Sequence, residues 1–99
     1  MENVLAEYVT KIVKIEDEEI TIKKLSVQDQ MEIEKMQDII ERGVLVIMKT
    51  VLKWSFKNID GQPLAITREN ILRMRADLIS ALGIETMKYS LKLKEESNG

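Results

Sequence analysis

Two runs of alternating hydrophobic and polar residues stand near the start of the chain. Residues 8–15 and 20–25 each alternate, and their valine, isoleucine and threonine content favours strands. The four acids at positions 16–19 make a polar turn between them. Two alternating runs around a short turn predict a β-hairpin, which must pack against another element because an isolated hairpin is marginal in water.

The hydrophobic period becomes helical after residue 26. Ser26 can accept a backbone N–H group, and Asp29 three positions later completes a variant of the capping box. Residues 27–42 combine high helix propensity with apolar residues at helical spacing, and Gly43 is a natural stop. The apolar spacing nevertheless continues past Gly43. One long, bent helix from residue 27 to about residue 57 is therefore an alternative, because a glycine inside a helix costs only about 1 kcal/mol.

The clearest loop of the chain covers residues 58–63. Its Asp60-Gly61 pair favours a tight turn, and the chain's one proline follows two positions later. Thr67 is then predicted to cap an amphipathic helix that ends near Gly83.

The pattern weakens toward the C-terminus. Residues 84–91 allow a last, weaker helix, and residues 93–99 are expected to form a frayed tail. With 99 residues the chain can build one hydrophobic core rather than two, so we expect a single domain over residues 1–99. The predicted fold class is α+β, mainly α, with the N-terminal β-hairpin packed on three to four helices.

Composition and charge narrow the choice of partners. The chain is 44% hydrophobic and 32% charged, values typical of globular proteins. Its net charge of −2 and its pI near 5.2 speak against non-specific nucleic-acid binding, which needs a positive surplus. The longest apolar run is far shorter than the roughly 20 residues that a membrane span takes. The N-terminus carries acid where a signal peptide needs base. We therefore expect no nucleic-acid partner, no membrane association and a cytoplasmic location.

The residue types that are absent exclude most catalytic chemistry. The chain has no His and no Cys, which removes Ser–His and Cys–His nucleophiles, disulfides and thiolate metal sites. The loop around Asp60 resembles part of a calcium loop, but Phe56 and Thr67 then occupy positions that need acids. We expect no enzymatic activity, no catalytic residue, no cofactor and no metal site.

Binding residues are the remaining candidates. Lys49, Lys53 and Lys57 stand four residues apart, so a helix running through them would carry a basic stripe beside Trp54 that suits phosphate or an acidic partner. A solvated helix face opposite the core is the alternative. The stripe and the acidic hairpin could also meet in neighbouring copies of the chain.

Methionine is the other candidate for partner contact. Methionine side chains adapt to varied partners, and an exposed row of Met and Ile suits a protein that holds another chain's apolar helix. Core packing is the alternative for these positions. The resulting set of candidate partner-binding residues is Met36, Ile40, Met48, Lys49, Lys53, Trp54, Phe56 and Lys57.

One segment has a familiar order of features. In residues 51–71 an apolar stretch ends in Trp54, a loop with Asp60-Gly61 follows, and a Thr67-capped helix opens with Glu-Asn-Ile. Upstream, Leu-Ser-Val-Gln-Asp at residues 25–29 starts the first helix. From about residue 13 to 82 the chain resembles the tail assembly chaperones of long-tailed, siphovirus-like bacteriophages.

The resemblance implies a specific role. Such chaperones coat the long, apolar tape measure protein, keep it soluble, help recruit tail tube subunits and self-associate. They are absent from the finished virion, so the expected location is the host cytoplasm. Trp54 and Phe56 would then be anchor residues at the end of a helix, since Trp is favoured at binding hot spots. The alternative is that Trp54 fills the core under the Asp60-Gly61 turn.

Two other functions stay open at this point. The chain could be a different small phage-encoded interaction module, such as an inhibitor or an adaptor. It could also bind DNA through the helix with Arg68, Arg73 and Arg75. Arg73 and Arg75 are two residues apart and point to different sides of a helix, which weakens a groove-reading face.

Overall fold

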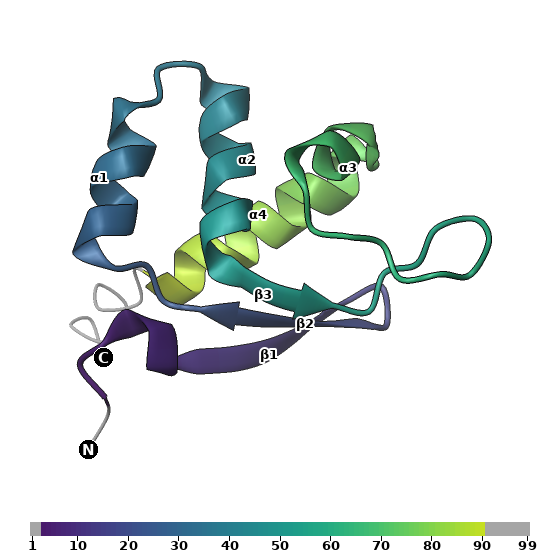
Figure 1. Cartoon of the computed structure of the whole chain (residues 1–99), viewed down its shortest axis with the longest axis horizontal. Coiled ribbons are helices and arrows are strands. Elements are labelled where there is room, and N and C mark those ends of the chain that lie inside the picture. Colours follow the sequence, from purple (N-terminus) through teal and green to yellow (C-terminus); the bar gives the residue numbers. More distant parts are fainter. Residues whose placement is uncertain (1–2, 91–99) are drawn as a thin grey trace.

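The computed structural model describes residues 3–90, so the tail expected at residues 93–99 lies outside the described residues. A short 3₁₀ turn precedes a three-stranded sheet and four α-helices (Figure 1). The α+β, mainly α fold class is confirmed. In chain order the elements are η1 (Ala6–Tyr8), β1 (Thr10–Ile15), β2 (Glu18–Lys23), α1 (Val27–Lys35), α2 (Ile39–Thr50), β3 (Val51–Trp54), α3 (Arg68–Arg73) and α4 (Ala76–Ser90).

The predicted N-terminal hairpin is confirmed. Strands β1 and β2 pair in antiparallel register from Thr10–Lys23 to Ile15–Glu18. Glu16 and Asp17 both have positive φ values, 52° and 68°, which makes the connection a two-residue turn of the left-handed kind that matches strand twist. The turn is shorter than the four acids suggested, because Glu18 and Glu19 belong to β2.

The first helix starts where predicted, at Val27 after the Ser26 cap, but neither predicted end, near Gly43 or near residue 57, is right. Helix α1 ends at Lys35, and α2 begins at Ile39, so Gly43 lies inside a helix instead of ending one. Asp38 explains the new start: its side chain accepts the N–H groups of Ile40 and Glu41, at 2.9 and 3.0 Å. Capping satisfies backbone N–H groups that would otherwise lack partners, which favours the start of a new helix at this position.

A third strand takes the place of the predicted long helix. Helix α2 ends at Thr50, and β3 pairs antiparallel with β2, giving the sheet order β1-β2-β3. The helical spacing of apolar residues reaches Val51 but is misleading there, because Val51 is buried as a residue of strand β3 and not of a helix. The pairing slips by one residue between Thr21 and Ile22, and this bulge leaves Leu52 about half exposed.

The helix predicted between Thr67 and Gly83 is divided in two, and its second part runs on into the weaker helix predicted from residue 84. The Thr67 cap is confirmed, since its hydroxyl accepts the Asn70 N–H at 3.1 Å. Helix α3 ends at Arg73, Met74 is extended, and α4 continues through Gly83 to Ser90. The expected end near Gly83 is therefore wrong.

The core lies between one face of the sheet and the helices. Helix α4 packs on β1 and β2 and is crossed by α2, as Figure 1 shows. Ile20, Ile22, Ile47 and Leu82 are fully buried at this junction. Among residues 3–90, no helix combines the length and the apolar character needed to cross a membrane.

Candidate partner-binding groove

An apolar groove of about 480 Å³ lies where α2, α3 and α4 meet. Ser80 contributes its only polar side chain, and none of its lining residues is ionisable. The groove is lined by Ile39, Ile40, Gly43, Val44, Ile47, Ile71, Leu72, Met74, Ala76, Ile79, Ser80 and Gly83. Such walls can bury aliphatic groups but offer no partner for a charge.

The helices build this groove with a buried floor and an exposed rim. Val44, Ile47 and Ile71 belong to the core and form the floor. Ile39 and Ile40 stand in the first turn of α2, directly after the Asp38 cap, and remain 80% and 67% exposed. Exposed apolar clusters often mark interaction sites, so these two isoleucines make the rim a candidate contact surface.

Ion pairs hold the helices around the groove. The Arg68 guanidinium binds both oxygens of the Glu41 carboxylate, with Nε 3.0 Å from Oε1, and so connects α3 to α2. This hydrogen bonding lowers the pKa of Glu41 and raises the pKa of Arg68. Both groups face solvent, so the pair contributes orientation more than stability.

A second ion-pair cluster joins the start of α4 to the hairpin turn. Arg75 Nη2 lies 2.7 Å from Asp77 Oδ2 and 2.7 Å from Glu16 Oε2. The hydrogen bonds that Arg75 donates, first to Asp77 and then to Glu16, raise the pKa of Arg75, and the pKa of Asp77 falls in turn. Two of the three arginines considered for DNA binding are thus engaged with carboxylates.

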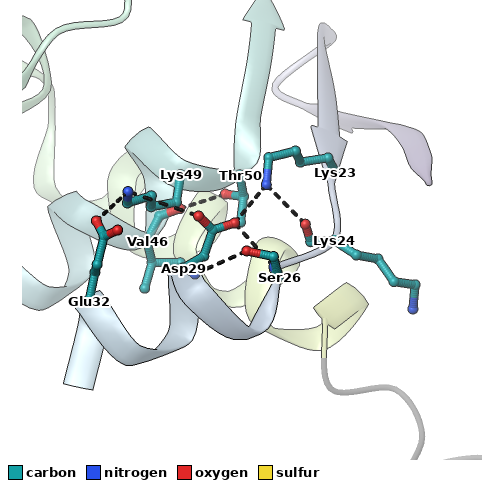
Figure 2. Close-up of polar contacts among 8 residues, drawn as sticks. All are labelled: Lys23, Lys24, Ser26, Asp29, Glu32, Val46, Lys49 and Thr50. Carbon is teal, nitrogen blue, oxygen red and sulfur yellow. Dashed lines mark hydrogen bonds and ion pairs between the residues drawn. The ribbon is translucent and has the colours of Figure 1, made fainter. Parts of the chain in front are cut away.

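The predicted basic stripe is wrong. Lys49 is on α2, Lys53 is on β3, and Lys57 follows the strand, so no single helix face carries the three. Lys49 binds Glu32 at 2.5 Å and lies 3.9 Å from Asp29 (Figure 2). The hydrogen bond that Lys49 donates to Glu32 raises the pKa of Lys49. Lys49 therefore fastens α2 to α1.

The confirmed capping box stands at the centre of Figure 2. Ser26 Oγ accepts the Asp29 N–H at 3.0 Å, and Asp29 Oδ2 accepts both the Ser26 N–H and Lys23 Nζ, at 3.1 and 2.8 Å. Burial alone would raise the pKa of Asp29, but the hydrogen bonds donated by Lys23 and Ser26 lower it more, so the net effect is a lowered pKa. This cluster connects α1 to the end of β2 and therefore has a structural role.

The aromatic candidates lie away from the groove. Trp54 Nε1 donates to the Leu64 carbonyl at 2.6 Å, and the Trp54 and Phe56 rings meet edge to face with centroids 5.2 Å apart. Phe56 is buried and Trp54 is packed against the core. These contacts agree with the alternative in which Trp54 fills the core beside the loop.

Ile40 alone among the eight predicted residues lines the groove. Met36 is partly buried where α1 ends, and its carbonyl accepts two hydrogen bonds from Arg42. Met48 is 41% exposed on α2 but outside the groove. Sequence reasoning missed Ile39, although its place next to the capping residue Asp38 could have marked it as an exposed first-turn position.

Comparison with known proteins adds no relative. No family model, curated protein or solved structure matches the chain significantly. Within residues 3–90, no three acidic side chains gather closely enough to hold a metal ion.

Proposed function

We propose that this chain is a tail assembly chaperone that holds an apolar helical segment of a tape measure protein in the groove between α2, α3 and α4. The observation that carries the proposal is the uncharged, aliphatic groove with Ile39 and Ile40 exposed on its rim. The resemblance of residues 13–82 to such chaperones supports the same function.

The energetics suit a reversible holder. Burying an exposed isoleucine contributes about 1.5–3 kcal/mol, so the rim isoleucines and Leu72 supply the favourable contact. Association offsets several kcal/mol of this through lost motional freedom. These two terms are of similar size, which is the energetic balance expected of a weak, reversible contact. The mechanism needs no covalent step.

The surroundings of the groove favour solubility of the complex. The Glu41–Arg68 pair lies exposed between α2 and α3, and the other helix faces carry charge. Binding would thus bury the apolar face of the partner helix, and the complex would present the charged helix faces of this chain to solvent. Recruitment of tail tube subunits, self-association and location in the host cytoplasm belong to the same proposal.

Co-expression tests this function with a matched pair of variants. The tape measure protein of the same genome is co-expressed with the wild-type chain, with Ile40→Asp or with Ile59→Asp. Ile59 is 99% exposed in the loop and lies outside the groove, so its variant controls for adding an acid.

We expect the wild type and Ile59→Asp to keep the tape measure protein soluble and to co-purify with it, and Ile40→Asp to lose both effects. Failure of the wild type to bind contradicts the chaperone proposal and leaves the inhibitor or adaptor alternative. Equal binding by Ile40→Asp contradicts the placement of the site in the groove.

A further inference from the structure

Two glycines inside helices have no explanation within the chain itself. Gly43 is in α2 and Gly83 is in α4, where glycine is the least favourable residue after proline. Neither has the positive φ that calls for glycine, which among the described glycines only Gly61 shows. A Cβ built at Gly43 or Gly83 would meet no atom within 4 Å apart from the backbone of its own helical turn. Neither backbone conformation nor internal packing therefore requires them.

Both glycines line the same groove, from two helices that pack against each other. A side chain at either position would project into open space instead of the core, because nothing stands within reach of its Cβ. The missing side chains therefore leave the groove open on its α2 and its α4 wall.

The dimensions of the groove fit one helix. Its α2 wall runs from Ile39 to Ile47, eight steps or about 12 Å, and two helical turns span about 11 Å. A cavity of about 150 Å³ holds one benzene-sized group, so about 480 Å³ takes roughly three side chains. Two turns present three side chains on one face, at i, i+3 or i+4, and i+7.

The charge of the groove further defines its occupant. None of the lining residues is ionisable, so a charged side chain entering the groove would be buried without a partner. The face that enters must therefore be uncharged over all three positions.

We propose that Gly43 and Gly83 set the size of side chain that the groove accepts. The occupant is a partner helix with three large aliphatic or aromatic side chains on one face, and the central one seats between the two glycines. This inference rests on the proposed function, in which the groove holds an apolar helix.

The test separates binding from folding with alanine substitutions. Gly43→Ala, Gly83→Ala and the double variant are compared with wild type, and Lys88→Ala, at an exposed position of α4 outside the groove, is the control. The probe is a fluorescein-labelled, alanine-based helical peptide with leucine at i, i+4 and i+7. A second peptide has alanine in place of the central leucine. Fluorescence anisotropy measures Kd, and urea unfolding measures stability.

We expect Gly43→Ala and Gly83→Ala to raise the urea midpoint, because alanine is the better helix former. The same variants should bind the three-leucine peptide roughly tenfold more weakly, since an added methyl overpacks the site. Binding of the peptide with central alanine should change less than twofold. Lys88→Ala should bind both peptides as the wild type does.

Three results would overturn the inference. Unchanged affinity of both glycine variants for the three-leucine peptide means that the glycines do not set the size. A lower urea midpoint means that glycine serves the fold of the chain itself. Dissociation of an oligomer by Gly43→Ala in sedimentation velocity means that a second copy occupies the groove. Absence of wild-type binding to any apolar helix, by contrast, would count against the proposed function.

Discussion

Replacing Asp38 by alanine removes the cap on which the open rim of the groove is built. The Asp38 carboxylate accepts two backbone N–H groups of the first turn of α2, at 2.9 and 3.0 Å. Loss of such a cap costs about 1 kcal/mol, with a range of 0.5–2. The negative charge also favours the helix N-terminus, which adds a few tenths of a kcal/mol at low salt. We expect Asp38→Ala to lower the free energy of unfolding by about 1–1.5 kcal/mol.

The assay is urea unfolding at pH 7, followed by circular dichroism, with Asp38→Asn as the matched control. Asparagine caps helices as well as aspartate does, so this variant should lose only the small charge contribution. In a domain of this size, 1 kcal/mol corresponds to a melting shift of roughly 4–8 °C. Equal stability of Asp38→Ala and the wild type, or equal losses in both variants, would refute the capping argument for the break between α1 and α2.

Three further predictions test the fold. Leu82 is fully buried between α4, α2 and the sheet, so Leu82→Ala should lower the free energy of unfolding by about 2–5 kcal/mol in urea denaturation; a loss below 1 kcal/mol would contradict this packing. The pKa of Asp29 is lower in the folded chain than in the unfolded chain, where it is near 3.8. Ionised Asp29 therefore stabilises the folded chain above this pH, and the stabilisation is lost as pH falls. Acid titration should therefore cost the wild type more stability than Asp29→Asn between about pH 5 and pH 2, and equal slopes would contradict it. Asp17 has a left-handed φ of 68°, so Asp17→Gly should raise stability by up to about 1 kcal/mol in thermal melts, and a clear loss would argue against this turn.

Local rules predicted the parts of the fold that depend on neighbours in sequence. The hairpin follows from period-two alternation, and the caps at Ser26 and Thr67 follow from side chains that bond the next turn. The loop at Asp60-Gly61 follows from turn preference, and Gly61 does adopt a φ of 80°.

The errors arose where distant contacts outweigh local preference. The local pattern predicts helix ends at Gly43 and Gly83, yet both residues stay helical because tertiary packing holds α2 against α4. Strand β3 pairs with β2 across some 30 residues, a contact that no local pattern shows.

The candidate site was predicted only in part, for the same reason. Ile40 was recognised because it continues an apolar helical spacing. Its neighbours in the groove, Leu72 and Ile79, come from α3 and α4, and only the break after Arg73 brings both helices to α2. The basic stripe failed because a continuous helix was needed to align its lysines.

Hydrogen exchange with and without the tape measure protein tests the central claim most directly. The account predicts that binding slows amide exchange in residues 39–47 and 71–80, around the groove, and leaves β1 at its free rate. Protection confined to the sheet, or no protection at a concentration that keeps the tape measure protein soluble, would contradict it.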